Sequence, residues 1–158
     1  MAKFPTEVEC SITVKVPVEK AYKYLADVVA SSKCIPGLAS CKRVSTDTYR
    51  FQYEKRTTGP ISMSVQYTAR YDVDGKSRIS FASTSGKNDN TDVEGELHLQ
   101  KSGADATKIT LRQKLAPDTP VPMLLQGLIR GMVSKEASAV ATEYLNNIKR
   151  ALESAKKA

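Results

Sequence analysis

The sequence has few of the residues that small proteins use for chemistry or cross-linking. It contains one histidine, three cysteines and no tryptophan. A zinc site rich in histidine is excluded by count, and an odd number of cysteines argues against a disulfide framework. No stretch approaches the roughly 18 apolar residues of a membrane helix, and residues 1–7 lack the apolar core of a signal peptide. We therefore expect a cytoplasmic protein with reduced thiols.

Acidic residues are outnumbered by basic ones, 17 against 24, which gives a net charge of +7 at pH 7. Such a balance favours an anionic partner, for example nucleic acid, a membrane surface or an acidic protein. The basic residues are nevertheless spread along the chain, with no run of five or more. Those near the C-terminus, from Lys149 to Lys157, also complement the dipole of a helix end. We therefore predict no nucleic-acid partner.

Apolar and polar residues alternate at every second position over most of the sequence, which predicts half-buried antiparallel strands. The first such strand covers residues 8–16 and ends at Pro17. The pattern is strongest at 61–72, where we expect the longest strand, and the Asp74-Gly75 pair after it is typical of a hairpin turn. Further strands are expected at about 39–45, 49–54, 78–84, 91–101 and 108–116.

Helical spacing replaces this alternation in three places. Apolar residues at i, i+4 and i+7 predict a short helix at 18–25, and a second short helical turn is expected at about 28–33. Three prolines between 117 and 122 interrupt the chain, and the proline-free segment 123–155 after them predicts one long helix. Its apolar stripe has steps of three and four residues: Val133, Ala137, Val140, Tyr144, Ile148 and Ala151.

The start of this helix, residues 123–132, carries a second apolar set that is rotated by about 100° from the stripe: Leu124, Leu125, Leu128, Ile129 and Met132. Gly127 and Gly131 lie on one side of the same segment, and glycines are recognised sites of helix bending. Either the helix bends near Gly131, or its first turns meet something besides the sheet, or the small residues permit close packing on the sheet. We expect this segment to act as a lid.

The order of strand, two short helices, five or six strands and one long helix predicts a single α+β domain over residues 1–158. An antiparallel sheet with one apolar face must cover that face, and only the C-terminal helix is long enough to do so. We therefore predict a curved antiparallel sheet of six or seven strands wrapped around that helix. The space between them is either packed shut or a ligand cavity.

The opening strand into the run Val16 to Asp27, the long strand and the terminal helix together resemble the START-like, or helix-grip, superfamily, which includes polyketide cyclases. Three shorter motifs are similar to the carbon monoxide dehydrogenase G-subunit branch: Cys34-Ile35-Pro36-Gly37, Gly59-Pro60-Ile61-Ser62 and Gly127-Leu128-Ile129-Arg130-Gly131-Met132. The resemblance implies a cavity for hydrophobic small molecules and, in this branch, a role in quinone binding or enzyme maturation. Many members of the branch carry a C-terminal tail or anchor, whereas this sequence ends at Ala158, so we expect no membrane tether.

Histidine and cysteine offer little chemistry here. By alternation His98 belongs to the polar face of its strand, so we expect a solvated histidine rather than a catalytic one. Cys10 belongs to the apolar face of the first strand and is expected in the core. Cys34 lies in a loop, where it is either a reactive thiol or packed against the sheet edge.

Three carboxylates, Asp92, Glu94 and Glu96, share one strand face and resemble a metal or acid–base cluster. Arg70 and Arg78 lie on the polar faces of neighbouring predicted strands, and cross-strand pairing with them accounts for the carboxylates without chemistry. The sequence therefore predicts no catalytic residue, no metal site and no cofactor.

Candidate ligand-binding residues come from the inward-facing apolar sets, which are rich in tyrosine. A buried phenol needs a hydrogen-bond partner, so several inward tyrosines indicate an apolar cavity with polar tips. The alternative is a packed core whose tyrosines reach water at the sheet edge. The predicted ligand-binding residues are Tyr49, Phe51, Tyr53, Met63, Val65, Tyr67, Phe81, Gln113, Leu128 and Met132.

We interpret the chain as a carrier for a hydrophobic small molecule such as a quinone, a lipid or a polycyclic aromatic compound. A partner enzyme or a membrane surface is its expected further partner. The alternative is an enzyme resembling polyketide cyclases and dehydratases, in which cavity shape and proximity promote cyclisation and Tyr53 or Tyr67 serves as the acid. The pattern indicates no particular oligomeric state.

Overall fold

The computed structural model describes residues 2–3, 5–58, 61–84, 89–119 and 123–157, and for residues 2, 3, 56, 58, 61, 63, 119 and 155–157 the backbone alone. Its elements follow the chain in this order: β1 (Ala2–Lys3), β2 (Thr6–Val14), α1 (Val18–Ala26), α2 (Val28–Ser32), β3 (Leu38–Ser45), β4 (Thr48–Tyr53), β5 (Arg56–Thr58), β6 (Ile61–Met63), β7 (Gln66–Val73), β8 (Arg78–Thr84), β9 (Thr91–Lys101), β10 (Thr107–Thr119), the 3-10 turn η1 (Met123–Leu125) and α3 (Gln126–Lys157).

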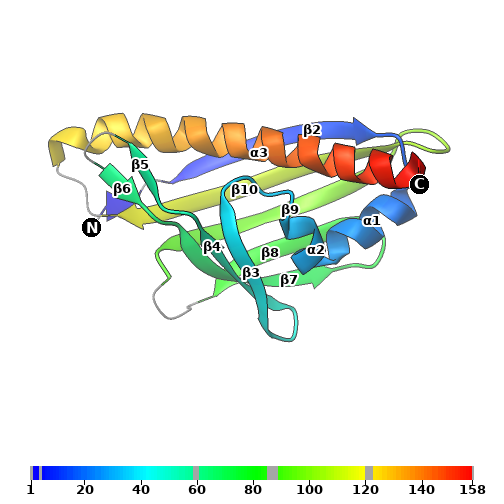
Figure 1. The fold of residues 1–158 in the computed structure, drawn as a ribbon, viewed down its shortest axis with the longest axis horizontal. Helices are drawn as coiled ribbons and strands as arrows, with labels where there is room; N and C mark the ends of the chain where they lie inside the picture. Colours follow the sequence, from blue (N-terminus) through cyan, green and yellow to red (C-terminus); the bar gives the residue numbers. More distant parts are fainter. Residues whose placement is uncertain (1, 4, 59–60, 85–88, 120–122, 158) are drawn as a thin grey trace.

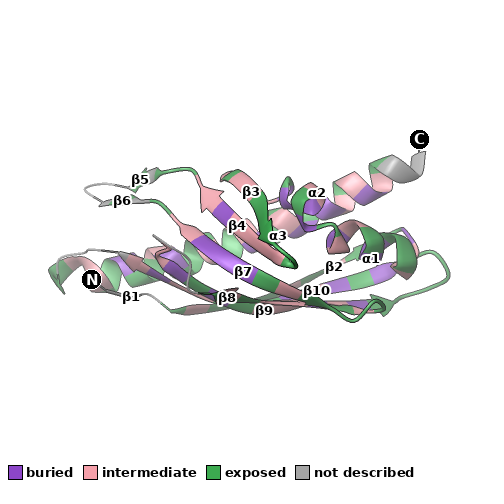
Figure 2. Ribbon diagram, turned by 90° about the horizontal axis from the view of Figure 1, so that it is seen from below, coloured by how far each residue is buried: buried purple, intermediate pink, exposed green. Residues whose placement is uncertain are grey.

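Seven strands form one curved antiparallel sheet in the order β2-β10-β9-β8-β7-β4-β3, and the two-residue β1 pairs with the far end of β10. The strands β5 and β6 pair separately. Figure 1 shows α3 running the length of the sheet, with α1 near the C-terminal end of that helix. Figure 2 shows the sheet curving below α3, α1 and α2. The predicted helix-grip architecture, with two short helices after the first long strand, is confirmed.

The predicted longest strand, residues 61–72, is divided in two, because β6 ends at Met63 and β7 begins at Gln66. The side chain of Asn90 occupies the break. Its amide group donates to the carbonyl oxygen of Ser64 (2.5 Å) and accepts from the backbone N–H of Gln66 (3.0 Å). Alternation continues through the break in the sequence, so the pattern alone predicted one strand. Gly59 and Pro60, the first two residues of the second motif named above, lie outside the described residues.

The last strand is longer than predicted, because β10 continues through Pro117 to Thr119. Successive N–H groups of a strand point to opposite sides, and the N–H of Asp118 donates to Asn90 on the β9 side (2.7 Å). The nitrogen of Pro117 therefore faces the other side, where pairing passes from β2 to β1. A missing N–H is tolerated at such an interruption. Pro120 and Pro122 lie outside the described residues.

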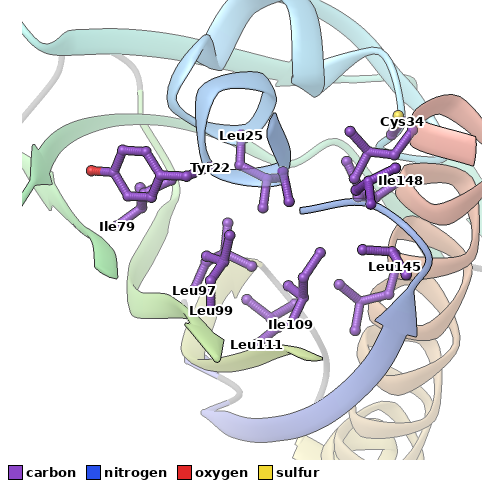
Figure 3. Close-up of a cluster of buried hydrophobic side chains, with 14 of the residues drawn as sticks. Tyr22, Leu25, Cys34, Ile79, Leu97, Leu99, Ile109, Leu111, Leu145 and Ile148 are labelled. Atoms are coloured by element: carbon purple, nitrogen blue, oxygen red, sulfur yellow. The ribbon is translucent and has the colours of Figure 1, made fainter. Parts of the chain in front are cut away.

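The C-terminal half of α3 closes one end of the molecule. Leu145, Ile148 and Leu152 are each at most 2% exposed, and they pack with buried residues of α1, β9 and β10 in one cluster. Figure 3 shows how Leu145 and Ile148 of α3 face the side chains of the sheet and Leu25 of α1. A second buried cluster, centred on Phe51, Tyr67 and Val93, lies on β4, β7 and β9.

The N-terminal end of α3 contrasts with this packed end. The helix is continuous from Gln126, and a Cβ atom on Gly127 or Gly131 would meet nothing within 4 Å. These glycines therefore do not serve close packing on the sheet. Leu124 is 97% exposed and Leu128 65% exposed, so the second apolar set faces outward in part. Among the described residues, no helix is both long and apolar enough to cross a bilayer.

Candidate ligand-binding cavity

A cavity of about 480 Å³ lies between the inner face of the sheet and the first half of α3. Alternation brings inward-facing residues of β7, β9 and β10 to its floor, and the apolar stripe of α3 forms its roof. The sheet and loop side contributes Pro36, Gly37, Tyr53, Glu54, Val65, Tyr67, Thr91, Val93, Gln113, Leu115 and Pro117; the helix contributes Ile129, Met132, Val133, Lys135, Glu136, Ala137, Ala139 and Val140.

Side-chain size along α3 accounts for the position of this cavity. Of the eight α3 residues that border the cavity, the three that belong to the predicted apolar stripe, Val133, Ala137 and Val140, have small side chains. Further along, the helix presents Leu145 and Ile148, which fill the space above the sheet. Small side chains leave a gap between helix and sheet that the larger ones close. The composition of the stripe therefore divides the interior into an open part and a packed part.

Tyr53 and Tyr67 mark the inner end of the cavity. Their hydroxyl groups lie 3.4 Å apart, and the Tyr67 ring stacks on Phe51 with 5.0 Å between ring centroids. Burial raises the pKa of Tyr53, and burial together with the neighbouring phenols raises the pKa of Tyr67 well above its ordinary value. Both phenols are therefore protonated at neutral pH and act as hydrogen-bond donors or acceptors without charge.

A second, smaller pocket of about 70 Å³ continues beyond this pair. Tyr53, Tyr67, Gln113 and Val140 border both spaces, so the pocket adjoins the cavity. We call it the inner pocket, and the 480 Å³ space the outer cavity. The remaining walls of the inner pocket come from α1, α2, the strands and α3: Leu25, Val28, Ser31, Ser32, Ile35, Phe51, Tyr71, Phe81, Leu97, Leu111, Ala141 and Tyr144.

Residues 5–153 match the protein-family model described as polyketide cyclase / dehydrase and lipid transport. The chain belongs to this family. The match spans nearly the whole sequence, which agrees with one fold extending from β2 to the end of α3. No curated protein matches the chain.

Solved structures with this family's fold include a START superfamily protein from Mycobacterium smegmatis, with a TM-score of 0.70 and 16% identity over 94% of this chain and 97% of that one. An aromatase/cyclase from Streptomyces sp. R1128 has a TM-score of 0.66 and 17% identity, covering 94% of each chain. A protein from Thermus thermophilus has a TM-score of 0.72 and 18% identity over 94% of this chain and 98% of that one. These similarities establish a shared fold.

The ten residues predicted from the sequence occupy different places in this family fold. Tyr53, Val65, Tyr67, Gln113 and Met132 line the outer cavity. Phe51 and Phe81 line the inner pocket. Tyr49 borders neither space and packs edge-on against Tyr71, with ring centroids 5.6 Å apart. Leu128 is 65% exposed and lies outside both spaces, and the side chain of Met63 is outside the described part of the structure.

Sequence reasoning left several lining residues out of the predicted set. Tyr71 and Tyr144 both border the inner pocket, and the alternation of β7 and the stripe of α3 respectively place them inward. Val93 and Leu115 border the outer cavity and share the inward phase of β9 and β10. Pro36 and Gly37 lie on a loop without periodicity, so only the structure reveals their position at the cavity.

Of the three carboxylates that resembled a catalytic cluster, Glu96 forms a cross-strand ion pair. Glu96 pairs with Arg78 (3.3 Å) as predicted. The other predicted partner, Arg70, lies opposite Thr48 and Ala82 and is separated from β9 by β8. Arg112 and Lys114 of β10 instead pair with Glu9 (3.2 Å) and Glu7 (3.5 Å) of β2.

The three thiols and the single histidine lie apart from the outer cavity. Cys34 is buried, with its sulfur 3.4 Å from the hydroxyl of Tyr24. Cys10 is half-buried, and burial raises its pKa. His98 lies opposite Thr110 and Arg78. Within the described residues, no three His, Cys, Asp or Glu side chains gather closely enough to hold a metal ion.

Proposed function

We propose that this chain binds a hydrophobic small molecule in the outer cavity and carries it. The observation that supports this function is a 480 Å³ space with mainly apolar walls and a few neutral polar groups at its inner end. Small-molecule sites commonly have volumes of about 300–1,000 Å³ and linings of this kind. A lipid tail, a quinone or a polycyclic aromatic compound has the required apolar surface.

The state of the cavity tyrosines favours binding over proton transfer. A general acid works best when its pKa lies near the working pH, whereas burial raises the pKa of Tyr53 and Tyr67 further from neutrality. Such phenols hold their protons and serve well as hydrogen-bond donors. His98, the one histidine of the chain, lies on a strand position that does not border the outer cavity.

A substitution that fills the outer cavity tests this proposal. Ala137 borders the cavity, whereas its neighbour Ser138 is exposed and does not. We expect Nile red to bind the wild-type chain saturably, Ala137→Phe to weaken that binding by about tenfold or more because the ring occupies ligand space, and Ser138→Phe to leave it unchanged. Native mass spectrometry after mild purification should also show a retained small molecule. A chain that retains nothing and binds neither Nile red, a quinone nor a fatty acid does not have this function.

A cyclase or dehydratase activity is the second candidate, and the paired hydroxyls of Tyr53 and Tyr67 favour it. They lie where the inner end of a substrate would be, within a cavity whose shape can hold a flexible chain near a closing geometry. Turnover of a poly-β-ketone substrate should then fall when Tyr53 or Tyr67 is replaced by Phe. Unchanged turnover in both variants removes this version of the enzyme.

We further propose that the chain belongs to the carbon monoxide dehydrogenase G-subunit branch. The ligand would then be a quinone, which a partner enzyme or a membrane surface would supply or receive. Its support is that two of the three branch-like motifs border the outer cavity, through Pro36 and Gly37 and through Ile129 and Met132. Fractionation of producing cells and extraction of the bound ligand test it. A quinone from a chain in the cytoplasmic fraction supports the branch and the location; a fatty acid contradicts the branch, and a chain held in the membrane fraction contradicts the location.

A further inference from the structure

We propose that the inner pocket selects the ligand by accepting a small, uncharged, oxygen-bearing end, such as a ketone or quinone carbonyl, and by rejecting a carboxylate or a phosphate. This inference rests on the proposed binding function, because it assigns the chemistry of one end of the molecule held in the outer cavity. Three independent properties of the inner pocket support it: its size, its charge and its hydrogen-bonding groups.

The size of the inner pocket limits what can enter it. The inner pocket, about 70 Å³ in volume, is several times smaller than the outer cavity. Such a space suits a small end group, such as a carbonyl with its neighbouring carbon, better than a bulky one such as a sugar. The outer cavity, about 480 Å³, would therefore hold the bulk of the ligand and the inner pocket only its tip.

The walls of the inner pocket contain no charge that could balance an anion. Of the sixteen described residues that line it, none is Asp, Glu, Lys, Arg or His. The charged residues that border the outer cavity, Glu54, Lys135 and Glu136, are all exposed. A carboxylate at the inner end would be a buried charge without a partner, which is strongly unfavourable.

The polar groups of the inner pocket differ in whether the protein already satisfies them. Ser31 and Ser32 donate to the backbone carbonyls of Asp27 (2.9 Å) and Val29 (2.6 Å). Tyr53 and Tyr67 share one hydrogen bond, which leaves one of their two hydroxyl hydrogens available. These four side chains therefore offer a ligand at most one donor.

Three further side chains complete the set: Tyr71, Tyr144 and Gln113 border the inner pocket. Within the described residues, none of their side-chain polar atoms has a hydrogen-bond partner. Each carries a donor, and burial raises the pKa of Tyr71 and of Tyr144, so both phenols keep their protons. A ligand oxygen that accepts hydrogen bonds, as a carbonyl does, can be bound by these donors.

Aromatic packing fixes the position of one of these donors. The ring of Tyr71 stacks on Phe81 with 5.3 Å between centroids and meets the edge of Tyr49 at 5.6 Å. A ring held on two sides loses little freedom when its hydroxyl binds a ligand. Replacing Tyr71 or Tyr144 by Phe keeps the ring and removes only the hydroxyl, so the fold should be retained.

Matched probes separate the apolar and polar parts of recognition. We choose 2,3-dimethyl-1,4-naphthoquinone, whose ring positions are blocked against thiol addition, together with 2,3-dimethylnaphthalene, which has the same shape without the carbonyls, and 2-naphthoate, which carries a charge. Dissociation constants are measured by displacement of Nile red from wild type, Tyr71→Phe, Tyr144→Phe and the control Tyr49→Phe. Tyr49 contacts the Tyr71 ring but borders neither space.

We expect the wild type to bind the quinone most tightly and 2-naphthoate most weakly. Each inner-pocket variant should weaken quinone binding by about three- to tenfold, the usual worth of one hydrogen bond, without changing hydrocarbon binding, and Tyr49→Phe should change neither. Tightest binding of 2-naphthoate, or equal effects of Tyr71→Phe and Tyr49→Phe on the quinone, overturns the selection proposal while leaving the carrier function intact. Failure of all three probes and of Nile red to bind overturns the carrier function itself.

Discussion

Gly95 of β9 lies so close to β10 that a Cβ atom on it would stand 2.5 Å from the carbonyl oxygen of Arg112. The Cα and Cβ atoms of Gln113 would lie at 2.9 and 2.8 Å. Because backbone atoms cannot rotate away as a side chain does, the two strands would have to separate. We expect Gly95→Ala to lower the free energy of unfolding by about 1–3 kcal/mol, measured by urea denaturation. Ligand affinity should fall too, since Gly95 is paired with Phe81 and Gln113, which both border the inner pocket.

Gly127→Ala is the matched control for this substitution. A Cβ atom there meets nothing within 4 Å, and the residue lies within α3. Alanine should therefore raise the free energy of unfolding by up to about 1 kcal/mol through its higher helix propensity. Equal effects of the two substitutions would contradict the close approach of β9 and β10 at Gly95.

Contacts between segments that are distant in the sequence explain where the sequence-based prediction of strands succeeded and where it failed. Alternation predicted β8 and β9 with their observed bounds, because each strand face is decided by residues next to one another in the chain. The break between β6 and β7 depends on Asn90, more than 20 residues further along, and nothing near Ser64 announces it. Pro117 is likewise accommodated only by the interruption between β1 and β2.

We expect Asn90→Ala to destabilise the start of β7. The substitution removes the acceptor of the Gln66 N–H and the donor to Ser64, and each unsatisfied group costs about 1–3 kcal/mol when shielded from water. Hydrogen exchange at the Gln66 amide should accelerate more than exchange at Ala69, in the middle of the same strand. Uniform acceleration along β7 would argue that Asn90 supports the whole sheet rather than this break.

The stability of the hairpin between β7 and β8 should depend on pH through the carboxyl group of Asp74. Its carboxylate accepts hydrogen bonds from the backbone N–H groups of Arg78 (3.0 Å), Lys76 (2.7 Å) and Ser77 (2.9 Å). These bonds lower the pKa of Asp74 from 3.8 to about 2. A lowered folded-state pKa stabilises the fold above the unfolded pKa, and that stabilisation is lost as the pH falls from about 4 toward 2.

Comparison with Asp74→Asn tests this dependence. At pH 6 the wild type should have the higher urea midpoint, and the difference between the two proteins should shrink as the pH approaches 2. An NMR titration of the Asp74 carboxyl measures the pKa directly. A difference that is constant between pH 6 and pH 2 means that the charge of Asp74 contributes nothing to stability.

The candidate site was predictable in part, for a geometric reason. Residues such as Tyr53, Tyr67 and Gln113 follow from strand alternation, because inward phase is a local property. Leu128 was predicted at the site although its position lies nearly opposite the stripe that faces the sheet, whereas Ile129 lies closer to that stripe. In the structure the side chain of Leu128 is exposed and lies outside the cavity. The division into an outer cavity and an inner pocket depends on side chains from many separate elements. No single segment of the sequence therefore predicts it.

The turn η1 and the first turns of α3 should be the most labile part of the roof over the cavity. Leu124 is 97% exposed, whereas Ile129 and Val133 are buried and border the outer cavity. Residues 123–132 therefore cover the cavity, and they contribute less to the packed core than the turns around Leu145 and Ile148. Local stability follows buried contact of this kind. We expect faster amide hydrogen exchange in 123–132 than in 137–148, and slower exchange in 123–132 once Nile red fills the cavity.

If these turns open to admit ligand, then strengthening the helix there should slow entry. Replacing Gly127 and Gly131 by Ala adds up to ~1 kcal/mol of helix stability at each position, and neither Cβ atom meets a neighbour. Stopped-flow association of Nile red should therefore slow by up to about fivefold per glycine, with little change in the equilibrium affinity. The opposite result has two parts: hydrogen exchange in 123–132 is as slow as in 137–148 and does not change when Nile red binds, and the association rate is unchanged in the variant. Ligand would then enter by another route, and residues 123–132 would form a fixed wall.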